Sequence, residues 1–208
     1  MGIKVNQETL QMIADLSNAR GASGFEDETV QAAAKHIGEG YTTEEDCLRN
    51  FYMYRTANSG NKPVFMLDAH SDEVGFMVHS IRPNGTLRFV ALGGWNVGSL
   101  ASSKVLVRNS EGKYLPGVIA AKPVHFMSAS EKASAGAADI SSLSIDIGAV
   151  SAKDAAENFK IRIGEPVVPD VTLEYDEEHD LMFGKAFDCR IGCAALIETL
   201  RRLRDEKL

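Results

Sequence analysis

Cysteine is scarce in this sequence, and long apolar runs are absent. Cys47, Cys189 and Cys193 are the only cysteines among 208 residues. They are too few, and odd in number, for a disulfide framework, which indicates a reducing compartment. No stretch approaches the roughly 18 consecutive apolar residues of a membrane span, and the amphipathic N-terminal residues do not resemble a signal peptide. We therefore expect a cytoplasmic protein that does not bind a membrane.

Clusters of basic residues are also missing. The chain has 22 Lys and Arg against 29 Asp and Glu, for a formal net charge of -7. No run of Lys and Arg is present that would neutralise a phosphate backbone, so we expect no nucleic-acid partner. The content of 44% hydrophobic and 25% charged residues is typical of a globular chain with one sizeable core or two small ones.

Helical periodicity marks the two ends of the chain. Apolar residues recur at helical spacing in residues 6–20, a second helix is predicted to follow the acids at 26–28, and residues 184–208 carry a third helical pattern. Residues 47–57 alternate around aromatics, as a strand does. The nearly continuous apolar run at 63–70 predicts a strand that is buried on both faces in the centre of a sheet.

The middle of the chain has a different texture. Between residues 74 and 170, short apolar segments alternate with turns rich in Gly and Pro, which predicts an all-β module. One short helix is expected after Ser151, which is suited to cap it and has Asp154 three residues on. The predicted organisation is an α/β domain in two parts, residues 1–73 and 171–208, interrupted by a β insert at 74–170.

A histidine and an acid follow the predicted central strand in "VFMLDAHSDEVGF". Residues i and i+2 of an extended chain face the same way, so His70 and Asp72 project together. Such a pair suits a metal ligand with a carboxylate that orients it, and sites gather at the carboxyl ends of strands in α/β sheets. A purely structural His–Asp pair at a strand end is the alternative.

Asp188 precedes the last predicted helix in "GKAFDCRIGCAALIETL". It is a candidate metal ligand, and equally a candidate N-cap, the commoner use of Asp at a helix start. Arg190 is suited to pair with Asp188 or with a substrate carboxylate.

Seven segments together resemble a known enzyme family in their order and spacing. They are "ASGFEDETV", "MLDAHSDEVGFMVHSI", "LGGWNVGSL", "LPGVIAAKPVH", "LSIDIGAVSAKDA", "IGEPVVP" and "FGKAFDCRIGCAALIETL". Nearly the whole chain is similar to the tetrahedral, glutamyl and deblocking aminopeptidases, also labelled cellulase M.

The resemblance implies an α/β fold, with a phosphorylase/hydrolase-like zinc-peptidase catalytic domain interrupted by a β-barrel-like dimerisation domain. It implies a cytoplasmic enzyme with two divalent metal ions, zinc or cobalt, that removes residues from the N-termini of peptide substrates. It also implies a homo-oligomer, a dimer or a dodecamer. By match to the family pattern, His70 is a ligand of one metal, Asp188 bridges both metals, and Asp72 is the catalytic-site acid that orients His70.

The sequence departs from the family pattern in several places. Ser71 and Cys189 stand where the family often has methionine and asparagine, and neither is a ligand position. The family chain also continues beyond this point, with paired glutamates, an aspartate and a histidine that complete the site. Glu177 and Glu178 precede Asp188 and are interpreted as part of a solvated loop.

These departures predict that the 208-residue chain binds metal weakly or not at all and is catalytically silent, an incomplete portion of an aminopeptidase. The alternative is a naturally shortened, non-catalytic relative that acts as a self-association module. A glycosidase would need two carboxylates flanking a sugar cleft, and no such pair stands out.

Other candidate residues are given structural interpretations. Cys189 and Cys193 are expected to be packing residues, and Met66 and Met77 to fill a core. Trp95 is assigned to a core rather than an interface. The remaining histidines, His36, His79, His125 and His179, are expected to be surface or satisfied core residues.

Overall fold

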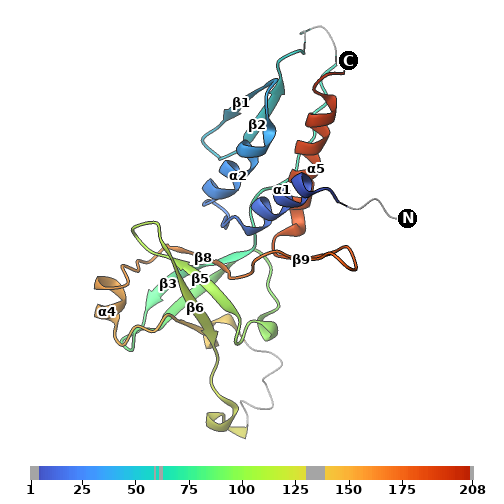
Figure 1. The fold of residues 1–208 in the computed structure, drawn as a ribbon. Helices are drawn as coiled ribbons and strands as arrows, with labels where there is room; N and C mark the ends of the chain where they lie inside the picture. The colour runs from blue at the N-terminus through green and yellow to red at the C-terminus, as the bar shows by residue number, and fades with distance from the viewer. Residues whose placement is uncertain (1–4, 59, 61–62, 130–138, 207–208) are drawn as a thin grey trace. The chain divides into compact units, whose positions relative to one another are not determined.

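The computed structural model describes residues 5–58, 60, 63–129 and 139–206. The chain divides into two compact units, one formed by Met1–Glu73 and Val171–Leu208 and the other by Val74–Asp170. Helices and sheets are both present, so the expected mixed α/β class is confirmed (Figure 1). Within the described parts of the chain, no helix is long and apolar enough to cross a bilayer.

The first unit contains three main helices and two small antiparallel sheets. Its elements are α1 (Gln7–Asn18), α2 (Asp27–Ile37), β1 (Tyr41–Glu45), β2 (Phe51–Arg55), β9 (Glu174–Asp176), β10 (Leu181–Phe183) and α5 (Phe187–Leu203). β1 pairs with β2, and β9 pairs with β10. The three helices and the strand predicted around the aromatics at 51–54 are therefore confirmed.

The core of this unit lies where the three helices meet. Met12 and Leu16 on α1 pack with Ala194 and Ile197 on α5, and alanines of α2 pack against them. Asn6 begins α1 because its side-chain oxygen accepts the Thr9 N–H at 2.8 Å. This packing joins α5, which carries Asp188, to α1 and α2.

The segment after β1 and β2 differs from its prediction. Residues 63–72 belong to no strand among the described residues, and Val64, Phe65 and Met66 are between 79% and 92% exposed. The prediction of a central strand buried on both faces was wrong, as was the assignment of Met66 to a core. An apolar run shows that a segment suits burial, but a strand also needs neighbours for its N–H and C=O groups.

The second unit is built on a closed barrel. Its strands are β3 (Gly75–Ile81), β4 (Leu87–Leu92), β5 (Lys104–Arg108), β6 (Tyr114–Ala120), β7 (Ser144–Asp146) and β8 (Pro166–Pro169), in the order β3-β4-β7-β6-β5-β8. Short 3-10 helices lie at Val97–Ser99, Val124–Phe126 and Ile140–Ser142, and α4 spans Ala152–Glu157. The predicted β segments are confirmed in this unit.

Alternating residues fill the barrel. Phe76, Val78, Leu87 and Phe89 of β3 and β4 are buried together with residues of the other strands, as the period of two along a strand requires. Trp95 stacks on Phe76 with ring centroids 4.6 Å apart and donates its indole N–H to the Gly75 carbonyl at 3.0 Å. Trp95 is thus partly buried against the core of this unit.

The helix expected after Ser151 is confirmed as α4. The Ser151 hydroxyl accepts the Asp154 N–H at 3.1 Å, which is the capping bond. The Asp154 carboxylate accepts the Val150 N–H at 2.9 Å, one residue before the cap. In the usual capping box the third helical residue accepts the N–H of the N-cap residue itself. Here Asp154 accepts the N–H of the residue before the N-cap instead.

Candidate metal site

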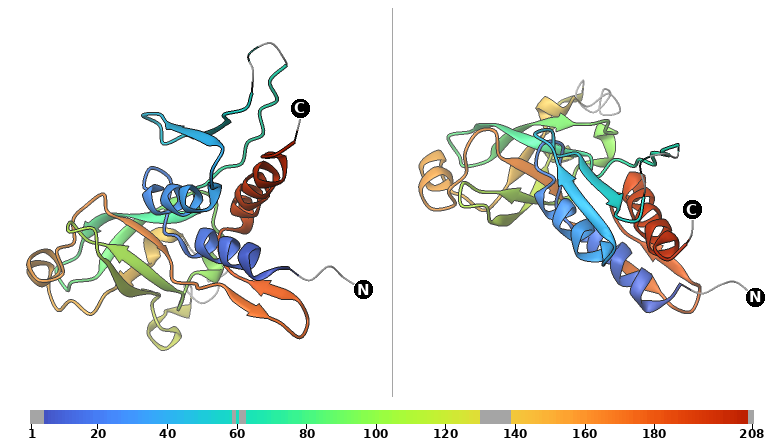
Figure 2. Two further views of the ribbon diagram at one scale, coloured as in Figure 1. Left: turned by 45° about the horizontal axis from the view of Figure 1, so that its top comes forward. Right: turned by 90° about the horizontal axis from the view of Figure 1, so that it is seen from above.

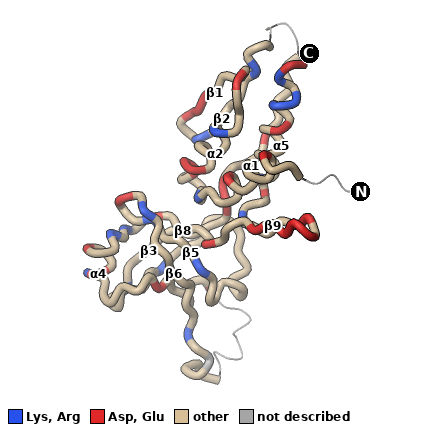
Figure 3. The backbone as a smooth tube through the Cα atoms, viewed as in Figure 1, with Lys and Arg blue, Asp and Glu red and all other residues tan. Residues whose placement is uncertain are grey.

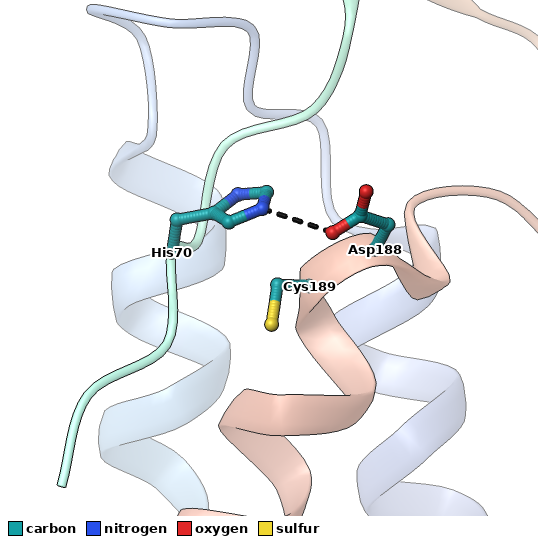
Figure 4. Close-up of side chains that lie close together, drawn as sticks. All are labelled: His70, Asp188 and Cys189. Atoms are coloured by element: carbon teal, nitrogen blue, oxygen red, sulfur yellow. Dashed lines mark hydrogen bonds and ion pairs between the residues drawn. The ribbon is translucent and has the colours of Figure 1, made fainter.

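His70 and Asp188 lie side by side, although 118 positions separate them. His70 is on the extended segment before Glu73, and Asp188 is near the start of α5. The His70 Nε2 atom is 3.1 Å from Asp188 Oδ1, and the side chains are 56% and 97% exposed. In Figure 4 the imidazole ring points toward the carboxylate. The structure therefore brings His70 and Asp188 together at a position exposed to solvent.

Asp72 holds the opposite edge of the same ring. The His70 Nδ1 atom lies 2.9 Å from Asp72 Oδ1, so the i, i+2 geometry expected of an extended segment holds here. The Ser23 hydroxyl donates to the other oxygen of Asp72. Ser23 is a member of the site that sequence reasoning missed, and its position in the turn between α1 and α2 gives no local signal for it.

These contacts affect the charge that the ring favours. An Nδ1–H donated to Asp72 leaves Nε2 directed at Asp188, where either a proton or a cation relieves repulsion between the nitrogen lone pair and the carboxylate. Partial burial lowers the pKa of His70, but hydrogen bonds to Asp188 and Asp72 outweigh it and raise this pKa above its ordinary value. The position facing Nε2 therefore favours positive charge.

Asp188 does not cap its helix. The backbone is non-helical at Asp188, with φ -88° and ψ 106°, and at Cys189, so the regular part of α5 begins after these two residues. Among the described residues, the Asp188 carboxylate contacts His70 and accepts no helix N–H that would make it a cap.

Arg190 has a structural role that sequence reasoning did not predict. Its side chain is 1% exposed and donates to the backbone carbonyls of Ser71 at 2.9 Å, Leu16 at 3.0 Å and Ala19 at 2.5 Å. The expectation that it pairs with Asp188 or a substrate carboxylate was wrong. Five guanidinium donors suit the task of joining three chain segments, so Arg190 holds α1 and α5 to the segment that carries His70.

A buried ion pair completes this support. The Lys185 ammonium lies 2.8 Å from Glu73 Oε1, which also accepts the Gly21 N–H at 3.1 Å. Burial lowers the pKa of Lys185, and Glu73 opposes that shift. Since Glu73 directly follows Asp72, the pair fixes the backbone on which the His70 and Asp72 side chains stand.

Cys189 also lies near His70 and Asp188. The His70 nitrogen, an Asp188 oxygen and the Cys189 sulfur all lie within 4.8 Å of one another. Nitrogen, oxygen and sulfur donors are the set that zinc and cobalt accept, whereas calcium and magnesium require oxygen. The chemistry of these donors fits an ion of the zinc class.

The other histidines and acids lie elsewhere in their units. His36 is buried and lies 2.8 Å from Asp15. His179 contacts Asp176 at 2.8 Å in the β9–β10 turn, where Glu177 and Glu178 also lie, and Figure 3 shows this hairpin as a stretch of acidic residues. Leu173 donates its N–H to Asn18 at 2.7 Å, so the chain enters this hairpin beside the end of α1 (Figure 2). The interpretation of residues 176–180 as a solvated turn is confirmed.

The sequence around these residues matches a known protein family. The profile of the M42 glutamyl aminopeptidase family matches residues 50–208, a range that holds His70, Asp72 and Asp188. The chain belongs to this family. The resemblance seen in the sequence motifs is confirmed.

Several relatives of this M42 chain are named aminopeptidases. Glutamyl aminopeptidase of Lactococcus lactis subsp. cremoris is 32% identical over 97% of this chain and 56% of its own length. The crystal structure of a TET aminopeptidase from the marine sediment archaeon Thaumarchaeota archaeon SCGC AB-539-E09 has a TM-score of 0.87 at 32% identity, covering 96% of this chain and 55% of that one.

A third relative is the Pyrococcus horikoshii TET1 peptidase, which can assemble into a tetrahedron or a large octahedral shell. It has a TM-score of 0.80 at 26% identity, over 95% of this chain and 57% of its own. The M42 chain thus spans somewhat more than half the length of these three relatives, and it shares the mixed α/β fold of the two structures.

Proposed function

We propose that this M42 chain carries one part of the metal centre of an aminopeptidase that releases N-terminal residues from peptides by two-metal hydrolysis. The observation that supports this most is His70 Nε2 facing Asp188 Oδ1 at 3.1 Å while Asp72 holds Nδ1. In this proposal His70 is a ligand of one metal, Asp188 bridges two, and Asp72 orients the imidazole.

Each residue has a task that its contacts support. Asp72, with Ser23 behind it, keeps the His70 proton on Nδ1 and so keeps the Nε2 lone pair available. Asp188 offers two oxygens from an exposed position, as a bridging carboxylate must. Two divalent ions, zinc or cobalt, would supply the Lewis acidity that polarises the scissile carbonyl and activates water.

We also propose that the 208-residue chain alone does not hydrolyse peptides. A catalytic zinc normally has three protein ligands, and here three donors from one small cluster would serve two ions. Within the described residues no further metal cluster accompanies it, and the paired acids Glu177 and Glu178 lie in the solvated turn. Weak metal binding without a general base is the expected result.

The test combines metal binding and activity. Zinc binding to the chain is measured by calorimetry, and His70→Asn and Asp188→Asn are each expected to weaken it, while His179→Asn in the β9–β10 turn leaves it unchanged. Equal zinc affinity in the wild type and all three variants would show that His70 and Asp188 are not ligands. Chelator-sensitive release of an N-terminal residue by the pure chain would show instead that the chain is active.

We propose that the barrel unit is a dimerisation domain and the helical unit a portion of a zinc-peptidase-like catalytic domain. Val90 on β4 and Val118 on β6 point out of the barrel and are 41% and 43% exposed, as an apolar contact surface requires. Light scattering after size exclusion is expected to show a metal-independent oligomer that Val90→Lys and Val118→Lys dissociate. A monomeric wild-type chain would contradict this.

The same barrel surface supports the second candidate function, a non-catalytic relative that acts through self-association. The two candidates differ in metal binding, since only the aminopeptidase portion requires His70 and Asp188 as ligands. Peptide substrates are proposed because the relatives are named aminopeptidases. A cytoplasmic location is proposed because the three cysteines are free.

A further inference from the structure

We infer that Cys189 supplies a thiolate ligand to a metal ion held with His70 and Asp188. This inference rests on the proposed function, in which the latter two residues are ligands, and it assigns a ligand that the family pattern does not have at this position. With this ligand, the metal site has one nitrogen, one oxygen and one sulfur donor, a set that favours soft or borderline cations.

The spacing of the three donor atoms suits a single ion. Ligand atoms around a tetrahedral zinc lie roughly 3.3 to 3.6 Å from each other, given zinc bond lengths of about 2.0 to 2.3 Å. The His70–Asp188 pair is at 3.1 Å, and the sulfur lies within 4.8 Å of both other atoms. Rotation about the Cα–Cβ bond of Cys189, which moves the sulfur between staggered positions, would be needed to bring it closer to this pair.

Gly192 provides the room that this sulfur occupies. A Cβ atom at this position would lie 2.7 Å from the Cys189 sulfur and 3.0 Å from the Ala69 side chain. Both distances are shorter than ordinary contact, so the absent side chain lets α5 approach the segment that carries His70. The thiol is therefore held between the two chain segments of the site. In Figure 4 the Cys189 sulfur lies on the side of its Cβ atom that faces away from the His70 ring and the Asp188 carboxylate.

Cys193 has a different environment, one turn further along α5. Its sulfur contacts the backbone carbonyl of His70 at 3.3 Å and that of Ala69 at 3.9 Å, and it is not among the three clustered donors. It packs against the small core of the helical unit. Cys193 is thus a matched control: the same residue type on the same helix, with the same segment as a neighbour.

Ligation changes both charge and selectivity. The Cys189 thiol loses its proton to the solvent as the metal–sulfur bond forms, so the bound state carries a thiolate. Thiolate ligands favour zinc and cobalt over magnesium, calcium and manganese. An asparagine in this place would offer only a neutral oxygen, so the same site would bind these ions more weakly and with less discrimination.

The experiment uses Co²⁺ alone as the probe of the whole chain. Addition of Co²⁺ to the wild type is expected to produce a near-ultraviolet thiolate-to-cobalt charge-transfer band, together with visible bands of a tetrahedral ion. Cys189→Asn is expected to lose the charge-transfer band and to weaken Co²⁺ binding by at least about tenfold. Cys193→Ser is expected to keep the band and the affinity.

Each result separates this inference from the proposed function. If His70→Asn and Asp188→Asn weaken Co²⁺ binding while Cys189→Asn changes neither band nor affinity, the thiolate ligand is refuted and the proposed function stands. Absence of Co²⁺ binding would refute the inference, and Co²⁺ binding that no variant affects would refute both. Loss of the band in Cys193→Ser with retention in Cys189→Asn would assign the thiolate to the other cysteine and refute the inference.

Discussion

At the scale of single residues, the site depends on a chain of contacts that ends at one nitrogen atom. Ser23 donates to Asp72, Asp72 holds the Nδ1 edge of His70, and Nε2 faces Asp188. Carboxylates behind a ligating histidine fix its tautomer and raise its basicity. In the proposed function Asp72 and Ser23 are positioning residues, so their effect should appear in metal binding rather than in stability.

Replacement of Asp72 tests this chain of contacts. Asp72→Ala is expected to lower zinc affinity by roughly 10- to 100-fold, the range found for partners of ligating histidines, and Ser23→Ala is expected to have a smaller effect. Calorimetric zinc titration gives the affinities, and thermal unfolding without metal checks that the fold is intact. An unchanged affinity in Asp72→Ala would show that Asp72 does not orient the ligand.

Asp15 gives a residue-scale prediction about pH. Partial burial raises its pKa, but hydrogen bonds from Lys35, His36 and Gln11 outweigh burial and lower the pKa to about 2. A lowered carboxylate pKa in the folded state stabilises the protein above the unfolded pKa near 4, and this stability is lost as pH falls toward about 2.

Asp15→Asn is accordingly expected to lower the free energy of unfolding by about 1 to 2 kcal/mol at pH 7. The difference from the wild type should shrink below pH 4 and vanish near pH 2. Urea unfolding at several pH values measures it. A difference that stays constant down to pH 2 would show that the ionised carboxylate is not its source.

At the scale of elements, similar apolar residues have opposite environments. Leu16 on α1 is buried in the contact between α1 and α5, while Phe65, in the segment predicted as a central strand, is 92% exposed. Burial depends on what packs against a residue, since the hydrophobic contribution is proportional to the area removed from water.

Two truncations are expected to separate these environments. Leu16→Ala should lower the free energy of unfolding by about 2 to 5 kcal/mol because it leaves a cavity, while Phe65→Ala should change it by less than about 0.5 kcal/mol. Chemical denaturation with a helix-sensitive signal provides both values. A cost for Phe65→Ala close to that of Leu16→Ala would show that residues 63–69 are packed in solution.

At the scale of the whole molecule, the described residues form two cores, and each belongs to one unit. The barrel encloses Phe76, Leu87 and their neighbours, while the helical unit packs around Leu16 and Ile197. The chain offers a separate probe for each. Trp95, the only tryptophan, is in the barrel unit, and α1, α2 and α5 are in the other.

A core truncation in one unit should therefore change the unfolding signal of that unit and not the signal of the other. Leu87→Ala is expected to lower the thermal midpoint seen by tryptophan fluorescence by roughly 10 °C or more and to leave the helical circular-dichroism midpoint in place. Leu16→Ala is expected to do the reverse. If either variant moves both midpoints equally, the chain unfolds as one cooperative unit.

The sequence by itself determined whatever depends on near neighbours. Periods of 3.6 and 2 specify α1, α5 and the barrel strands, a serine specifies the start of α4, and the i, i+2 rule places His70 and Asp72 on one side. The family motifs, which record the order of segments along the chain, identified the M42 family before any coordinates.

Only the tertiary structure decided what depends on distant partners. It brought Asp188 to His70 across 118 positions, added Ser23 and Cys189, and buried Arg190 among carbonyls of α1. It also left residues 63–72 outside any strand. The physical reason is the same in each case: a contact or a strand pair requires two chain segments, and local sequence describes only one of them.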